Sequence, residues 1–185
     1  PEAAKRLIGY IPDMPYLYDR LTATEFFAFT GDLFDIEPAR VAREWERSCS
    51  LFGLSDHRQA LIKDLSHGMR QRLIYASTFL HEPTILFIDE PLIGLDPYTI
   101  RLIKDLLIAK ARSGMTIFLT THILALAEDI ADRIGIIMNG SLAAVGTLDA
   151  LIRRHGGRDL EDMFLRLTRA EGLAPNHGSE GPEVS

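Results

Sequence analysis

The sequence predicts an α/β fold in which a parallel sheet carries an inserted helical segment. Residues 85–88 and 116–120 are short apolar runs separated by a helix-forming stretch, the order expected of neighbouring parallel strands. Between residues 15 and 80 the apolar residues instead recur at helical spacing. The chain is therefore expected to combine a sheet core with a mainly helical insertion.

The overall composition is that of an ordinary globular domain. The 185 residues are 46% hydrophobic and 25% charged, which suits one domain with a real core. The formal net charge of -6 argues against a nucleic-acid surface. Cys49 is the single cysteine and has no partner for an internal disulfide. No apolar run is long enough to cross a bilayer, so we expect any membrane association to come through a partner.

The first elements are a strand and a capped helix. Residues 7–11 form an apolar run that Pro12 closes, which predicts a buried strand entering a loop. Thr22 and Glu25 have the spacing of a capping box, so a helix is expected to begin there.

Two further helices follow before residue 81. Pro38 suits the first turn of one helix and Gly53 its end. Ser66 suits the N-cap of the next. The expected apolar faces are Val41, Trp45, Cys49 and Phe52 for the first, and Met69, Leu73, Ala76 and Leu80 for the second.

The second half of the chain alternates strands and helices. Residues 85–88 are apolar at every position, which predicts a strand covered on both faces. Pro97 opens a helix ending near Gly114, and another helical stretch starts near Leu124. Residues 134–138 and 142–145 flank an Asn-Gly turn and predict a hairpin. An amphipathic helix is expected over residues 160–169, and disorder beyond Ala170.

Adjacent carboxylates stand at the end of the predicted strand 85–88. Asp89 and Glu90 lie at the end of the strand where open parallel sheets bind ligands. The side chains of adjacent residues on an extended chain point to opposite sides, so the two carboxylates should have different roles. One can hold Mg²⁺, and the other can deprotonate a water aimed at a phosphorus atom. Taken alone, an ordinary acidic turn explains these residues as well.

Other motifs lie near the same sheet edge. Asp96 is placed to cap the helix that Pro97 opens, and His122 follows the strand 116–120. A helix start capped by Ser66, with Gly68 after it, attracts phosphate through its amides and dipole. Each motif also has a purely structural explanation as a helix cap, a structural histidine or a surface helix.

Together these motifs resemble the ATP-binding-cassette (ABC) ATPases. Leu-Ser-His-Gly-Met at residues 65–69 is similar to the family signature, and residues 85–91 to the Walker B strand with its glutamate. Residues 94–97 resemble the D-loop, 121–122 the switch histidine and 8–12 the strand before the Q-loop. Five motifs in the family's order leave little room for coincidence. The resemblance implies a RecA-like P-loop NTPase core with an inserted helical subdomain.

The resemblance also implies roles for particular residues. Asp89 would organise Mg²⁺, Glu90 would be the general base, and His122 would contact the γ-phosphate of ATP. Asp96 would couple the two sites of a pair of such domains. The signature residues would bind the nucleotide held by the opposite subunit; they are Ser66, His67, Gly68 and Met69.

The sequence departs from the family pattern in three ways. His67 and Met69 stand where Gly and Gln are usual, a variant that resembles the exporter branch. Asp13 occupies the Q-loop position, where it can still meet Mg²⁺ or its water. No Gly-x-x-x-x-Gly-Lys-Ser/Thr loop occurs in the 185 residues, so we expect an N-terminally truncated chain that lacks the first strands and hydrolyses ATP negligibly alone.

The expected function is that of the ATP-hydrolysing subunit of an exporter at the cytoplasmic face of the membrane. Its partners would be a transmembrane permease and a second nucleotide-binding domain, and no nucleic acid. The alternatives are a non-catalytic cassette module and a soluble family member acting on ribosomes or DNA. The expected divisions are 1–14 (core strand and Q-loop), 15–80 (helical subdomain), 81–150 (ATPase core), 151–169 (C-terminal helices) and 170–185 (tail).

Overall fold

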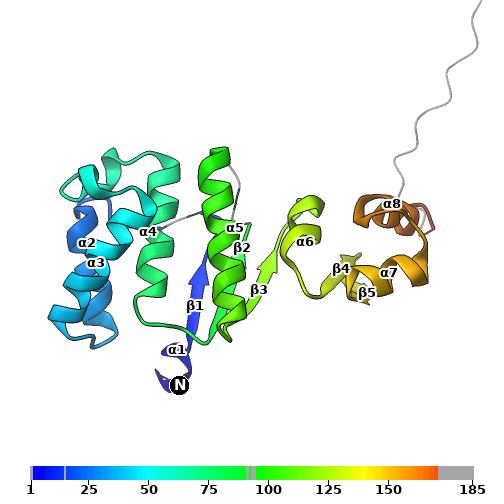
Figure 1. Ribbon diagram of the computed structural model, residues 1–185, viewed down its shortest axis with the longest axis horizontal. Helices are drawn as coiled ribbons and strands as arrows, with labels where there is room; N and C mark the ends of the chain where they lie inside the picture. Colours follow the sequence, from blue (N-terminus) through cyan, green and yellow to red (C-terminus); the bar gives the residue numbers. More distant parts are fainter. Residues whose placement is uncertain (1, 15, 91, 93–94, 171–185) are drawn as a thin grey trace, which may run out of the picture. The chain divides into compact units, whose positions relative to one another are not determined.

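The computed structural model describes residues 2–14, 16–90, 92 and 95–170 (Figure 1). The chain divides into two compact units, Pro1–His122 and Ile123–Ser185. The expectation of disorder beyond Ala170 falls outside the described residues.

A three-stranded parallel sheet organises the first unit. Its strands, in spatial order, are β1 (Ile8–Ile11), β2 (Ile85–Asp89) and β3 (Thr116–Thr120). Ile11 is the register partner of Ile88, and Asp89 that of Thr120. The predicted parallel sheet is therefore confirmed, and all three strands end at the same edge.

The first unit also contains helices. They are α1 (Glu2–Lys5), α2 (Ala23–Leu33), α3 (Pro38–Phe52), α4 (His67–Phe79) and α5 (Pro97–Arg112), with 3₁₀ turns η1 (Ser55–His57) and η2 (Ile62–Asp64). The Thr22–Glu25 capping box is present at α2, and Gly53 ends α3 in the left-handed conformation with φ 62°. The predicted starts of α2, α3, α4 and α5 and the predicted ends of α3 and α5 are confirmed.

An aromatic pair forms the core of the helical segment. The ring of Phe27, on α2, packs 4.7 Å from that of Trp45, on α3, and the indole N–H of Trp45 donates to the hydroxyl of Thr24 at 3.0 Å. Gly31 lets the helices approach, since a Cβ there would lie 2.4 Å from Val41. All four apolar residues expected on the inner face of α3 are buried. On α4, Met69 is half-buried, and the other three expected residues are buried.

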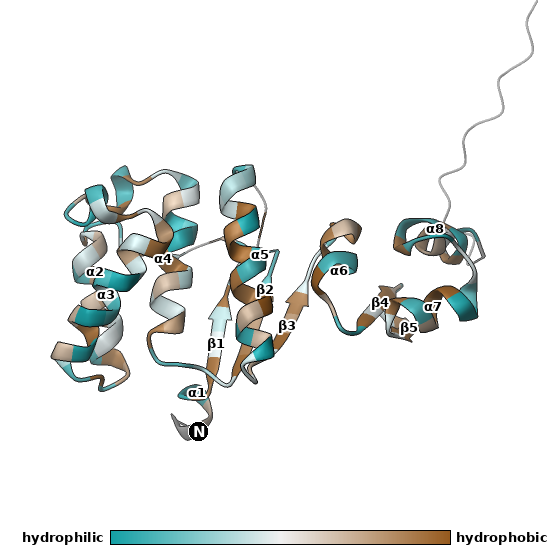
Figure 2. Ribbon diagram, viewed as in Figure 1, coloured by the Kyte–Doolittle hydropathy of each residue, from teal (hydrophilic) through white to brown (hydrophobic). Residues whose placement is uncertain are grey.

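One face of the sheet lies against α4. Gly9 permits this contact, because a Cβ there would meet Thr78, Leu86 and Pro83 at 2.8 to 3.0 Å. On the opposite face Phe87 and Phe118 stack at 5.2 Å and remain 40% and 56% exposed. Figure 2 shows that β2 and β3 are mainly hydrophobic along their length. The prediction that residues 85–88 are covered on both faces was therefore wrong for the described residues. An apolar run reports the hydrophobicity of a strand and cannot show whether a covering layer is present.

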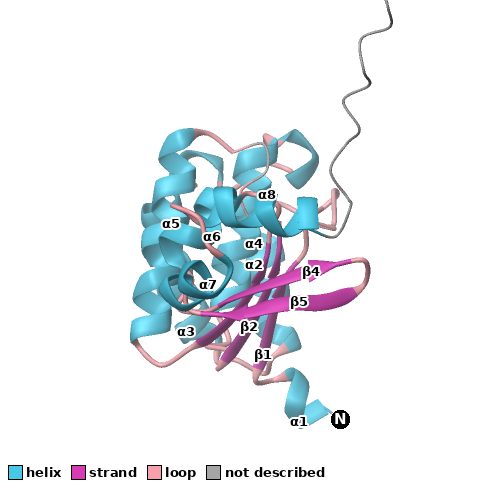
Figure 3. Ribbon diagram, turned by 90° about the vertical axis from the view of Figure 1, so that its right-hand side faces the viewer, coloured by secondary structure: helices cyan, strands magenta, loops and turns pink. Residues whose placement is uncertain are grey.

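The second unit has its own sheet and core. Its elements are α6 (Leu124–Ile130), β4 (Ile134–Met138), β5 (Ser141–Gly146), α7 (Leu148–His155) and α8 (Leu160–Ala170). The predicted antiparallel hairpin is confirmed, with Asn139 and Gly140 at φ 49° and 73° in its turn (Figure 3). Helix α8 buries Met163 in the core of this unit, and Phe164 and Leu167 pack on that core. Among the described helices, none is long and apolar enough to span a membrane.

Candidate functional site

Parallel pairing brings the predicted site residues to one edge of the sheet. Asp89 ends β2, Glu90 follows it, and His122 comes two residues after β3. Asp13 lies two residues beyond β1 and is exposed. Because the ends of the three strands are in register, these side chains belong to the same edge.

Glu90 and His122 are in direct contact. The Glu90 Oε1 lies 2.7 Å from Nδ1 of His122 and accepts the backbone N–H of His122 at 3.0 Å. An ionised carboxylate only accepts hydrogen bonds, so Nδ1 carries the hydrogen in this contact. The second oxygen, Oε2, has a longer contact, at 3.4 Å, from the hydroxyl of Thr121. This oxygen is thus the more available to a water molecule.

The backbone turns sharply between the two carboxylates. Glu90 has φ 48°, in the left-handed region that non-glycine residues rarely adopt, and its N–H donates to the carbonyl of Thr120 at 3.1 Å. Asp89 instead accepts a hydrogen bond from the hydroxyl of Thr120. The two carboxylates consequently have different partners, as their proposed division of labour requires.

The signature residues form the start of α4. The hydroxyl of Ser66 caps the helix by accepting the backbone N–H of Met69 at 3.3 Å. Ser66 and His67 are exposed, and Gly68 and Met69 are half-buried. A Cβ on Gly68 would meet one described atom within 4 Å, on Leu95 at 3.7 Å, which is an ordinary contact. Packing within the chain therefore does not demand glycine here, and the contact places this turn beside Leu95.

Asp96 caps α5 with both of its carboxylate oxygens. They accept the hydroxyl of Thr99 at 2.6 Å and its backbone N–H at 3.0 Å. Both bonds lower the pKa of Asp96 below its usual value, and the bond from the hydroxyl of Thr99 has the larger effect. Leu95 and Pro97, on either side of Asp96, are described. Two other residues of the predicted motifs, Gly94 and Pro91, lie outside the described residues.

Sequence reasoning missed the two threonines that hold the carboxylates. Thr120, the last residue of β3, binds Asp89, and Thr121, which follows the strand, binds Glu90. The available signal was the parallel pairing itself, since aligning the ends of the strands 85–88 and 116–120 sets Thr120 opposite Asp89. The left-handed backbone of Glu90 has no comparable signal in the sequence.

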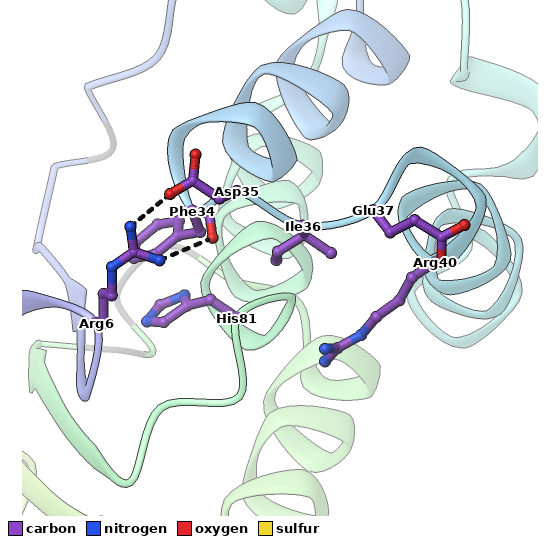
Figure 4. Close-up of a pocket in the computed structure, with 7 residues that line it drawn as sticks. All are labelled: Arg6, Phe34, Asp35, Ile36, Glu37, Arg40 and His81. Atoms are coloured by element: carbon purple, nitrogen blue, oxygen red, sulfur yellow. Dashed lines mark hydrogen bonds and ion pairs between the residues drawn. The ribbon is translucent and has the colours of Figure 1, made fainter.

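A pocket of about 300 Å³ lies elsewhere in the first unit, at the junction of α2, α3 and the end of α4 (Figure 4). His81 stacks on Phe34 at 3.9 Å, and Arg6 donates to the backbone carbonyl of Phe34 at 3.4 Å and to the carboxylate of Asp35 at 2.5 Å. Arg40 pairs with Glu82 at 2.9 Å. These contacts attach the connection between α2 and α3 to the first strand and to the end of α4.

Comparison with known proteins gives the class of the chain. A family model described as "AAA domain, putative AbiEii toxin, Type IV TA system" matches residues 14–128, more than half of the chain. A solved "Structure of ATP binding subunit of ABC transporter" superposes with a TM-score of 0.85 at 34% identity, covering 91% of this chain and 71% of that one. With its parallel sheet and site edge, the chain has the fold of a P-loop nucleoside triphosphatase.

Proteins of similar sequence identify the family of this chain. EcsA, an ABC-type transporter ATP-binding protein of Bacillus subtilis, is 31% identical over 92% of this chain and 70% of its own length. DrrA, a daunorubicin/doxorubicin resistance ATP-binding protein of Streptomyces peucetius, is 35% identical over 94% of this chain and 52% of its own length. The chain belongs to the family of ABC transporter ATP-binding proteins. It spans 45% of the length of a Synechocystis ABC transporter ATP-binding protein that is 35% identical to it.

Proposed function

We propose that this chain carries the hydrolytic site of an ATPase subunit that powers export through an ABC transporter. The observation that carries the proposal is the contact between Glu90 and His122 beside Asp89, at the edge where parallel strands end. A base, a polar group for the terminal phosphate and a carboxylate for a hard cation are thereby gathered in one place.

Glu90 serves as the general base. Its Oε2 is the oxygen with the weaker internal contact, and from there it can orient a water for attack on the γ-phosphorus and accept its proton. His122 holds the other oxygen, which fixes the direction of the carboxylate. When ATP is bound, the exposed ring of His122 contacts the γ-phosphate.

Asp89 and Asp13 are proposed to hold Mg²⁺. Asp89 and the hydroxyl of Thr120 offer the hard oxygen donors that this ion prefers. No group of three or more His, Cys, Asp or Glu side chains able to hold a metal converges in the described part of the chain, so phosphate and water would complete the coordination. Bound Mg²⁺ would neutralise charge on the β- and γ-phosphates.

Ser66, His67, Gly68 and Met69 are proposed to bind the nucleotide of a second nucleotide-binding domain, and Asp96 to couple the two sites. The start of α4 supports this role because its first backbone N–H groups and its dipole favour an anion, and because Gly68 leaves room for one. The carboxylate of Asp96 is engaged at the cap of α5, so its coupling would act through the position of that helix start.

The partner is proposed to be a transmembrane permease, with this subunit on the cytoplasmic face of the membrane. Export is the direction that the names of three relatives suggest, since they are described as linearmycin resistance, fluoroquinolones export and daunorubicin/doxorubicin resistance ATP-binding proteins. A membrane-spanning protein encoded beside this chain should co-purify with it, and its absence from the purified complex would contradict this part of the proposal.

The decisive experiment follows the reading frame upstream of the codon for Pro1 and expresses whatever complete protein it encodes. We expect a Gly-x-x-x-x-Gly-Lys-Ser/Thr loop in that protein and Mg²⁺-dependent ATP hydrolysis, because that loop cradles the β- and γ-phosphates. The 185-residue chain assayed in parallel should hydrolyse ATP negligibly. A complete protein without the loop and without hydrolysis would overturn the catalytic proposal.

A further inference from the structure

Arg70 connects three separate parts of the first unit. It lies in the first turn of α4, directly after the signature residues 66–69. Its Nη2 donates to the carbonyl of Lys63 at 2.9 Å and its Nε to that of Leu65 at 3.3 Å. Its Nη1 lies 3.6 Å from the carboxylate of Asp19. Each nitrogen of the planar guanidinium is therefore directed at a different acceptor.

The acceptors of Arg70 lie in two segments of the chain outside α4. Lys63 and Leu65 lie at the end of η2 and lead into the Ser66 cap. Asp19 lies in the segment that leads into α2 from residues 12–14, which we call the Asp13 loop. Backbone bonds join these segments too, from Ile62 to Leu21 at 2.9 Å and from Lys63 to Asp19 at 3.3 Å.

Arg70 adds a side chain of α4 that reaches both segments. The bond to the carbonyl of Leu65 is partly buried, whereas the ion pair is more open to water, because the side chain of Arg70 is 28% exposed and that of Asp19 is 61% exposed. Lysine would not reproduce these contacts, since its three N–H donors share one nitrogen whereas Arg70 uses three separate nitrogens in a rigid plane.

We propose that Arg70 is a positioning residue that fixes the signature turn relative to residues 16–22, the segment between the Asp13 loop and α2. This inference rests on the proposed function, in which the Asp13 loop meets nucleotide and Mg²⁺ of its own subunit and the signature turn meets the nucleotide of the opposite one. With Arg70 in place, a displacement of the segment after Asp13 is transmitted to Ser66 and Gly68. Arg70 itself touches neither nucleotide.

The test compares Arg70→Gln, Arg70→Lys and Asp19→Asn in the complete protein. Arg47→Gln is the matched control, because Arg47 forms an ion pair with Glu44 at 3.0 Å on the surface of α3, in the same helical segment. We expect Arg70→Gln and Arg70→Lys to lower kcat by about 10–100-fold while the KM for ATP stays within about twofold, since geometry and not binding is lost. Asp19→Asn should have a smaller effect that disappears in the Arg70→Gln background.

Amide hydrogen exchange supplies a readout that does not depend on catalysis. In the Arg70 variants, protection should fall together in residues 16–22 and 63–69, whereas the Arg47 variant should leave both segments unchanged. Faster exchange in α4 alone, or a kcat per folded molecule equal to that of the wild type, would overturn the positioning role. Wild-type protein that does not hydrolyse ATP would instead refute the proposed function, and the exchange pattern would then judge the role of Arg70 by itself.

Discussion

Replacing Glu90 by Gln tests the proposed chemistry with little change in shape. The substitution keeps the length of the side chain and removes its capacity to take a proton. Because general bases contribute about 10²–10⁴-fold to rates, kcat should fall by about that factor. The backbone conformation is not the cause, since Gln adopts φ 48° at about the same cost as Glu, of order 1–2 kcal/mol.

Glu82 provides a matched control for this substitution. It too is a glutamate with a left-handed backbone, at φ 51°, and it too contacts a basic side chain, Arg40, at 2.9 Å. Glu82→Gln therefore removes the same kind of interaction away from the sheet edge. The assay is phosphate release by the complete protein at saturating ATP and Mg²⁺, with thermal unfolding measured alongside. If Glu90→Gln kept more than about a tenth of the wild-type rate, or Glu82→Gln lost as much, Glu90 would not be the base.

Further predictions concern stability and reactivity. Phe27→Ala should lower the free energy of unfolding by about 3–5 kcal/mol, because its buried ring packs on Trp45; urea denaturation followed by the fluorescence of this single tryptophan measures the loss. Burial lowers the pKa of His81, so the unfolded chain binds a proton more readily and stability should decrease as the pH falls below about 6.5 toward the folded pKa. His81→Gln should flatten that part of the pH profile, and an unchanged profile would exclude His81 as its source. Burial raises the pKa of the Cys49 thiol to about 11, so a thiol reagent should modify it only as fast as the chain unfolds. Rapid modification of folded protein would contradict its burial.

Local chemistry explains why most element boundaries could be predicted. Caps such as Thr22 and Ser66, and the left-handed end at Gly53, depend on the residues of a single turn. The hairpin turn at Asn139 and Gly140 is equally local. Helix α7 was not identified individually, although Thr147 caps it in the same way as Ser66 caps α4.

Features that depend on distant neighbours were less predictable. The sequence placed Asp89, Glu90 and His122 at one edge, and the structure brings Glu90 and His122 into contact. It did not reveal the hydroxyl of Thr120 on Asp89, because that bond depends on the register of two strands. Nor did it reveal the exposure of Phe87, because burial is a property of the layer above a strand and not of the strand itself.

The parallel register of β2 and β3 also bears on the order in which a nascent chain gains structure. Glu90 and His122 are 32 residues apart and meet only when β3 has left the ribosome and paired with β2 across the whole of α5. The contacts of α2 with α3 join residues that are closer in sequence, all of which are synthesised well before residue 122. Since loop closure favours such near contacts, we expect the helical segment to condense first. The sheet edge that carries Glu90 and His122 would then be among the last parts of the first unit to form.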